Sequence, residues 1–245
     1  MNYYKLTLCY DGTRYNGWQR QGNTKDTLQE TVEGLLSNIL GVPVEAAASG
    51  RTDAGVHALE QVVSFHTAMN ISEGDILCKL RSCFPADIGA LSLEAAPPRF
   101  HARLSCKGKT YVYRVWNSDV PCVFERKYVH IVPEKLNDDA MRRAASALCG
   151  THDYQSFCSA KKMKHSTVRT VESIDIGRCG HELRLTYTGD GFLYNMVRIL
   201  TGTLLDVGRG LRRPEDMAGI LSALDRTAAG PTAPAKGLFL AHVTY

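Results

Sequence analysis

The feature that most constrains the fold is a change of hydrophobic period near the start of the chain. Residues 3–10 alternate hydrophobic and polar side chains, which predicts a half-buried strand. A capping box formed by Thr27 and Glu30 then precedes an apolar helical face, and Gly41 supplies a C-terminal stop for that helix. These signals predict a strand followed by a helix at the start of the chain.

The same signals recur in the order strand, helix, strand, strand, helix, strand, and this order occurs twice. The predicted elements are residues 3–10, 28–40, 44–49, 61–66, 75–84 and 88–95, and then 109–116, 138–148, 168–176, 182–188, 192–207 and 238–244. A segment at 128–132 and a helix after Pro214 are additions to the second half. We therefore expect an α+β protein with two ferredoxin-like (β-α-β-β-α-β) halves, residues 1–100 and 101–245. Their antiparallel sheets are expected to adjoin around a central cleft, which suits an extended polymer.

Length and composition exclude several classes of protein. A chain of 245 residues with 44% hydrophobic and 22% charged residues has the composition of one or two globular domains. It lacks the run of roughly 18 apolar residues that a membrane helix needs. The N-terminal residues lack the pattern of a signal peptide. These observations predict a soluble, cytoplasmic protein.

The cysteines and the charge balance are only partly informative. Eight cysteines are scattered without a C-x-x-C pair, which favours reduced, mostly buried thiols. A net charge of +4 is compatible with a nucleic-acid partner. Basic residues gather in three places: Arg14 and Arg20 beside Tyr15 and Trp18, residues 99–109, and Lys161, Lys162, Lys164, His165 and Arg169. Together these groups predict a surface that follows RNA phosphates.

The most informative stretch is the polar loop at residues 49–58, which reads Ser-Gly-Arg-Thr-Asp-Ala-Gly-Val-His-Ala between two predicted strands. Loops held by rigid neighbours are common places for active sites. A plain turn, in which the Asp53 carboxylate bonds nearby amides, accounts for the same residues. The loop alone therefore leaves both interpretations open.

Residues 50–58 closely resemble the signature of the tRNA pseudouridine synthase A (TruA) family. Five further stretches resemble this family in its order and at its usual separations. They are residues 10–13 with 17–21, 100–103, 109–111, 150–153, and 192–193 with 196–198. The resemblance runs from residue 3 almost to the C-terminus.

This resemblance implies isomerisation of uridine to pseudouridine in the anticodon stem-loop of tRNA, at tRNA positions 38, 39 and 40. It also implies a homodimer and a reaction that needs no cofactor and no metal. Such chemistry needs an ionised carboxylate near the sugar and the base, acting either as a nucleophile or as a base. The resemblance assigns this role to Asp53, and the sequence leaves both routes open.

Four other residues have expected roles around this carboxylate. Arg198, in a largely apolar helix, is expected to hold the Asp53 carboxylate ionised as a bidentate partner, although an arginine at a helix edge can also reach solvent. Tyr111 has the position of a core tyrosine, but the resemblance places its ring against an extruded uracil. Arg51 can bind the flipped nucleotide or hold the loop. We interpret His57 as a structural histidine of the loop.

Two functions of other classes fit parts of the sequence. A noncatalytic RNA-binding module can have a ferredoxin-like sheet, but residues 109–113 lack the core motif of the RNA recognition motif. A metal-dependent hydrolase could use Asp11, Asp53 and Asp190, but the sequence lacks H-E-x-x-H or a comparable cluster. Full activity of the protein in excess chelator would argue against the hydrolase. Loss of activity without loss of RNA binding in Asp53→Ala would argue against the noncatalytic module.

Overall fold

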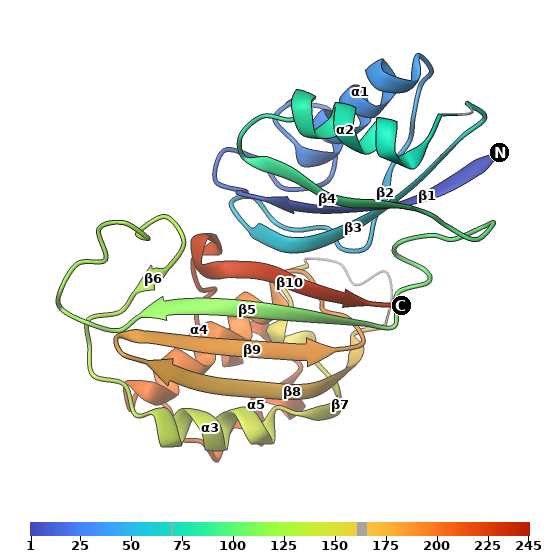
Figure 1. The fold of residues 1–245 in the computed structure, drawn as a ribbon. Helices are drawn as coiled ribbons and strands as arrows, with labels where there is room; N and C mark the ends of the chain where they lie inside the picture. The colour runs from blue at the N-terminus through green and yellow to red at the C-terminus, as the bar shows by residue number, and fades with distance from the viewer. Residues whose placement is uncertain (70, 161–165) are drawn as a thin grey trace. The chain divides into compact units, whose positions relative to one another are not determined.

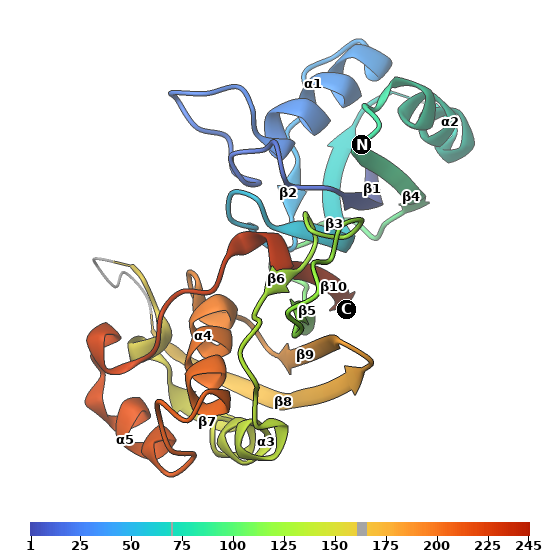
Figure 2. The same cartoon turned by 90° about the vertical axis from the view of Figure 1, so that its left-hand side faces the viewer.

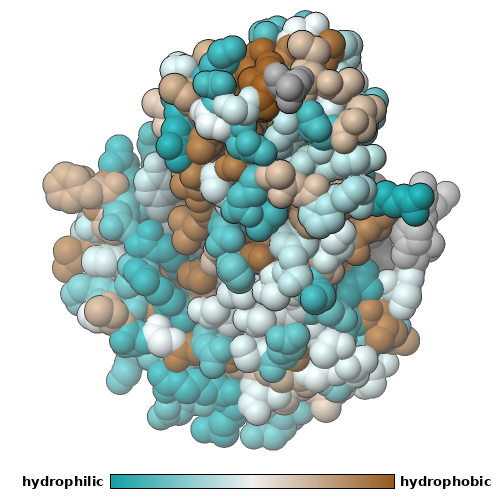
Figure 3. All heavy atoms as spheres, turned by 45° about the vertical axis from the view of Figure 1, so that its right-hand side comes forward, coloured by the Kyte–Doolittle hydropathy of each residue, from teal (hydrophilic) through white to brown (hydrophobic). Residues whose placement is uncertain are grey.

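A computed structural model describes residues 1–69, 71–160 and 166–245. The chain forms two compact units, which we call the first unit (residues 1–107 with 239–245) and the second unit (residues 108–238). On the face shown in Figure 3, hydrophilic side chains dominate and hydrophobic ones lie in small groups. Across the described residues, every helix is too short or too polar to cross a membrane.

The first unit is a mixed sheet covered by two helices. Its elements are β1 (Asn2–Tyr10), α1 (Leu28–Leu40), β2 (Ala47–Ala48), β3 (His57–Thr67), α2 (Glu73–Cys83), β4 (Ile88–Ala95) and β10 (Leu238–Thr244). The strand order is β4-β1-β3-β10, and β2 also pairs with β3. Strand β1 is antiparallel to both neighbours, whereas β10 is parallel to β3, with Phe239 opposite His57. Helices α1 and α2 lie on the same face of this sheet (Figure 1).

Local sequence explains the ends of α1, and burial explains its orientation. The Thr27 hydroxyl accepts a hydrogen bond from the Glu30 backbone N–H, and Gly41 ends the helix with a φ of 68°. Both features are as predicted. Val32 and Leu36 of α1 are completely buried, as is Leu6 of β1. The apolar face of the helix therefore forms the core of the first unit together with the sheet.

The second unit consists of paired strands with helices on one side (Figure 1). Its elements are β5 (Gly108–Trp116), β6 (His130–Ile131), α3 (Asp138–Ala147), β7 (Gly150–Asp153), η1 (Gln155–Phe157), β8 (Val168–Cys179), β9 (Glu182–Gly189), α4 (Met196–Gly208), α5 (Asp216–Ala223), η2 (Arg226–Ala228) and η3 (Ala235–Gly237). Strands β5, β9, β8 and β7 pair antiparallel in that order, and β6 is parallel to β5. Helix α4 lies along one face of the sheet, and α3 packs beside it (Figure 2). Every residue of α4 except Arg198 and Asp206 is buried.

The structure differs from the sequence prediction in several respects. The predicted halves, 1–100 and 101–245, assign the last strand to the second half, whereas this strand belongs to the first unit because it pairs with β3. Each unit contains a parallel strand pair, so the strand pairing is mixed rather than antiparallel. Helix α4 begins at Met196 instead of residue 192 because Asn195 has a left-handed φ of 61°. The central cleft stays a prediction.

The cysteines are all free, as predicted, but the prediction that most are buried is wrong. Only Cys158 is buried, and Cys78, Cys83 and Cys179 are exposed. Cys78 and Cys83 belong to α2, whose buried residues are Ile76 and Leu80, and Cys179 ends β8. A thiol on the outer side of a helix or at a strand end has no core to fill.

Candidate active site

The loop that carries Asp53 connects β2 to β3 in the first unit. Asp53 is half-buried, Arg51 is exposed, and Thr52 between them is buried. The backbone turns directly after Asp53, because the Val56 N–H donates to the Asp53 carbonyl over 3.1 Å and Gly55 has a φ of 76°. A left-handed φ is easily adopted by glycine, so Gly55 permits this turn.

A second loop, residues 11–26, lies against the Asp53 loop through the backbone. The Trp18 N–H donates to the Thr52 carbonyl over 3.0 Å, and the Gly55 N–H donates to the Tyr15 carbonyl over 3.3 Å. The approach is so close that a Cβ atom at Gly17 would lie 2.8 Å from the Thr52 carbonyl oxygen. The two loops therefore form one hydrogen-bonded layer that fixes the backbone on both sides of Asp53.

His57 holds the end of the same loop. Its ring is buried and stacks on Phe239, with centroids 4.7 Å apart and planes 24° apart. Its Nδ1 accepts a hydrogen bond from the Gly12 N–H over 3.1 Å. These contacts support the interpretation of His57 as a structural residue, because its ring joins the two loops to the last strand.

A polar network is buried beneath the loop. It contains Ser49, Gln61, Tyr10 and Thr52, all of them buried. The Gln61 side chain binds Ser49, Gly50 and Tyr10, and the Tyr10 hydroxyl binds Thr52 Oγ1 at 2.8 Å. Burial raises the pKa of Tyr10 to about 12, and its hydrogen bonds with Thr52 and Gln61 oppose this rise. Tyr10 is therefore a neutral phenol at physiological pH.

The sequence predicts no role for Tyr10 or Gln61. Tyr10 fits the alternating pattern of its strand and so resembles an ordinary core residue. Gln61 belongs to no motif and is a polar residue directly before a run of buried strand residues. Buried polar side chains need hydrogen-bond partners. A glutamine on the inner side of a strand next to a functional loop is the signal that could have revealed the network.

Tyr111 and Arg198 both lie in the second unit, whereas Asp53 and Arg51 lie in the first. Tyr111, on β5, is 9% exposed, and its ring packs edge to face on Phe192 with centroids 5.3 Å apart. Half-buried Arg198 donates from Nε to the Ala233 carbonyl over 2.8 Å and from Nη1 to Asn195 Oδ1 over 2.9 Å. Packing and hydrogen bonds thus fix both side chains. The bidentate pair between Asp53 and Arg198 stays a prediction.

The side chains of the predicted basic groups differ in whether they form ion pairs or hydrogen bonds. Arg14 pairs with Asp87, and Arg20 pairs with Glu30 and Glu33. Three other cations of the first unit are exposed, and their side chains make no hydrogen bond or ion pair within the described part of the chain. They are Arg99, Arg103 and Lys107. Lys161, Lys162, Lys164 and His165 lie outside the described residues, and Arg169 donates to the backbone carbonyls of Ser166 and Val168.

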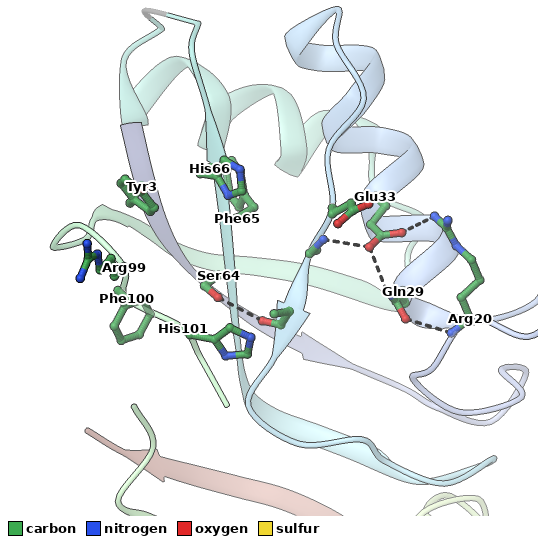
Figure 4. Close-up of a pocket in the computed structure, with 13 residues that line it drawn as sticks. Tyr3, Arg20, Gln29, Glu33, Ser64, Phe65, His66, Arg99, Phe100 and His101 are labelled. Carbon is green, nitrogen blue, oxygen red and sulfur yellow. Dashed lines mark hydrogen bonds and ion pairs between the residues drawn. The ribbon is translucent and has the colours of Figure 1, made fainter. Parts of the chain in front are cut away.

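Arg99 lines a pocket in the first unit (Figure 4). The pocket has a volume of about 450 Å³. Arg99 borders it together with five aromatic or imidazole side chains, Tyr3, Phe65, His66, Phe100 and His101. Glu33 forms part of the opposite side, where it accepts hydrogen bonds from the side chains of Arg20 and Gln29. Asp53 is not among the lining residues.

The alternative interpretation as a metal-dependent hydrolase needs a cluster of metal ligands. Within residues 1–69, 71–160 and 166–245, no group of three or more histidine, cysteine, aspartate or glutamate side chains could hold a metal ion.

The chain is similar to known proteins of one family. A family model described as tRNA pseudouridine synthase matches residues 144–245. A tRNA pseudouridine synthase A of Bacillus sp. (strain KSM-64) is 42% identical over 100% of both chains. The corresponding protein of Halalkalibacterium halodurans is 47% identical over 95% of this chain and 89% of its own. That of Geobacillus kaustophilus is 44% identical over 98% and 93%.

The solved structures that match this chain are less similar to it than these relatives are. An archaeal box H/ACA sRNP Nop10-Cbf5 complex matches with a TM-score of 0.37 and 14% identity, covering 83% of this chain and 44% of that chain. A Cbf5-Nop10-Gar1 complex matches with a TM-score of 0.38 and 14% identity, covering 83% and 45%.

Proposed function

The chain belongs to the tRNA pseudouridine synthase A family, and we propose that it isomerises uridine to pseudouridine in tRNA with Asp53 as the essential carboxylate. The observation that carries this proposal is the placement of Asp53 in a loop whose backbone is fixed on both sides by hydrogen bonds. In this reaction the base leaves its ribose, turns, and reattaches through carbon. A carboxylate assists either by attacking the substrate or by accepting a proton from the ribose.

The fixed loop favours this role because catalytic groups act best when they are already in position. A rigid backbone avoids reorganisation when the substrate binds, and small displacements of a reacting group reduce the rate strongly. Arg51 fits a contact with RNA, because it is exposed and its side chain has no hydrogen bond or ion pair to any described residue. Tyr111 would stack on the extruded uracil, and Arg198 would support the Asp53 carboxylate.

Replacing Asp53 by asparagine tests the proposal. Asp53→Asn keeps the size of the side chain but removes the carboxylate, so turnover should fall by roughly four orders of magnitude, as in other enzymes that lose an essential group. The affinity for tRNA and the melting temperature should stay close to the parental values. The measurements are pseudouridine formation in tRNA, tRNA binding and thermal unfolding. Turnover retained by the variant would remove Asp53 from the mechanism.

The same variant separates the enzyme from a noncatalytic RNA-binding module. A module would show no pseudouridine formation in the parental protein, whereas an enzyme shows activity that Asp53→Asn removes while tRNA binding survives. We further propose the family's target, positions 38, 39 and 40 of the anticodon stem-loop, and a homodimer working in the cytoplasm, where tRNA is the substrate. Mapping pseudouridine in tRNA from cells that lack this protein tests the target positions.

A further inference from the structure

We propose that Tyr10 and Gln61 are positioning residues, which hold the Asp53 loop in the geometry that catalysis requires. This inference rests on the proposed role of Asp53. Neither side chain would touch the substrate. Both would act through the backbone and side chains of residues that flank Arg51 and Asp53.

Gln61 holds the loop on the side before Arg51. Its side-chain amide nitrogen donates to the Gly50 carbonyl over 2.8 Å, and its amide oxygen accepts from the Ser49 hydroxyl over 2.7 Å. The oxygen also lies within 3.4 Å of the Gly50 N–H. Gln61 is 0% exposed, so water cannot replace these bonds without opening the core. One side chain of β3 thus fixes both backbone groups of Gly50.

Tyr10 holds the loop on the other side of Arg51. Its hydroxyl contacts Thr52 Oγ1 at 2.8 Å and accepts from the Gln61 amide nitrogen over 3.3 Å. Because the Tyr10 oxygen accepts from Gln61 in a buried site, its own proton is best satisfied by donation to Thr52. The carbonyl of Thr52 is also the acceptor for Trp18. Thr52 is therefore fixed by both its side chain and its backbone.

The two residues together form one chain of hydrogen bonds from Gln61 through Tyr10 to Thr52, the residue directly before Asp53. Loss of any link leaves a buried polar group without a partner or admits water, and either change lets the loop move. Active-site groups must be held within about 0.5 Å of the productive geometry. A small shift of Thr52 moves Asp53 with it, because the two residues share a peptide bond.

Strand β1 offers a matched pair of tyrosines for the test. Tyr10 is 5% exposed and Tyr4 is 3% exposed. The Tyr10 hydroxyl makes two buried contacts, with Thr52 and Gln61, whereas the Tyr4 hydroxyl makes one that is partly buried. The Tyr4 hydroxyl donates to the Ile71 carbonyl over 3.3 Å, in a segment far from the Asp53 loop in the sequence. Tyr10→Phe and Tyr4→Phe therefore make the same chemical change on the same strand, but only Tyr10→Phe releases the loop.

We expect Tyr10→Phe to reduce kcat by about 10- to 100-fold, the size of effect that a misplacement of about 1 Å produces. The KM for tRNA should change less than about twofold, because no tRNA contact is lost. Gln61→Glu, which removes the amide donor at nearly the same size, should reduce kcat similarly. Tyr4→Phe should keep the parental kcat even if its melting temperature falls as much as that of Tyr10→Phe.

A kcat for Tyr10→Phe equal to that of Tyr4→Phe would overturn the inference. If Gln61→Glu fails to fold, the comparison of Tyr10→Phe with Tyr4→Phe is sufficient to test it. Asp53→Asn measured in the same assay distinguishes this failure from a failure of the proposed function. If Asp53→Asn is inactive while Tyr10→Phe matches Tyr4→Phe, only the positioning role is wrong. If Asp53→Asn turns over tRNA, the role of Asp53 is wrong and the positioning role is wrong with it.

Discussion

At the scale of single residues, Arg198 shows how a charged side chain can be held inside an otherwise apolar helix. Its Nε and Nη1 donate to the Ala233 carbonyl and to Asn195 Oδ1 within the second unit. These bonds orient the guanidinium plane. A guanidinium oriented in this way has the planar fork geometry that matches a carboxylate.

Replacing Arg198 by lysine tests geometry separately from charge. Lysine keeps one positive charge but loses the planar fork, so support of the Asp53 carboxylate should weaken and kcat should fall by about 10- to 100-fold, or roughly 1.4–2.7 kcal/mol. The affinity for tRNA should stay the same because the overall charge is unchanged. Arg198→Met should reduce kcat further, while its stability stays near the parental value because a half-buried cation and its desolvation are removed together.

Arg226→Lys is the matched control in the same unit. Arg226 is also half-buried, and it donates to the Gly230 carbonyl and to Thr232 Oγ1. Its replacement should keep the parental kcat. If Arg198→Lys and Arg198→Met also turn over tRNA at the parental rate, Arg198 is structural, another group must keep Asp53 ionised, and Arg51 is the next residue to test.

At the scale of elements, the local signals of the sequence predicted the structure well. The Thr27 side chain caps the N-terminus of α1 and Gly41 ends the helix, as expected. The predicted capping box is only half formed, because the Thr27 N–H donates to the Lys25 carbonyl and the Glu30 carboxylate pairs with Arg20. Strand β4 has the predicted bounds, Ile88–Ala95, because it alternates and is flanked by a proline turn and a proline pair. Such features depend on neighbours in the sequence, which is why they can be predicted without a structure.

Features that depend on distant neighbours could not be predicted in this way. The pairing of β10 with β3 joins residues about 180 positions apart, and no local pattern specifies it. The position of Gln61 indicates a buried polar group, but its partners Tyr10 and Gly50 lie outside its strand and are not specified by any local pattern. The motif at residues 50–58 assigns Asp53 by resemblance, but the hydrogen-bond partners that hold its loop are visible only when the strands are assembled.

The contact between the two loops of the first unit predicts the effect of adding one methyl group. A Cβ at Gly12 would lie 2.0 Å from the Val56 carbonyl oxygen, which is backbone and cannot rotate away. Gly12→Ala should therefore separate the loops, lower the free energy of unfolding by about 1–3 kcal/mol, and reduce kcat. Urea denaturation and turnover measure these effects.

Gly22→Ala is the control for Gly12→Ala in the same loop. A Cβ at Gly22 meets no heavy atom within 4 Å among those described. It should leave kcat unchanged and change the free energy of unfolding by less than about 1 kcal/mol, in the stabilising direction if the backbone tolerates alanine. Equal effects of the two variants would show that the loops are not held by this close approach.

At the scale of the whole molecule, the net charge of +4 says less about RNA binding than which cations are free. Several arginines are neutralised by carboxylates, as Arg14 is by Asp87 and Arg213 is by Asp216. Arg99 and Arg103 are exposed and lack such partners among the described residues. A cation that already has a carboxylate partner releases fewer counterions when a phosphate approaches, so the free cations should dominate the salt dependence of tRNA binding.

Two double variants with equal loss of charge test which cations contact tRNA. Arg99→Ala with Arg103→Ala should reduce the slope of log K against log salt by about 1.4–1.8, since each phosphate contact contributes roughly 0.7–0.9. Arg14→Ala with Arg213→Ala removes the same number of positive charges but only from existing ion pairs, so the slope should stay near the parental value. Binding titrations at several salt concentrations measure both. Similar slopes for the two variants would mean that overall charge alone governs the attraction. An unchanged slope for the Arg99 and Arg103 variant would place the phosphate contacts elsewhere, with Lys161, Lys162 and Lys164 the next set to replace.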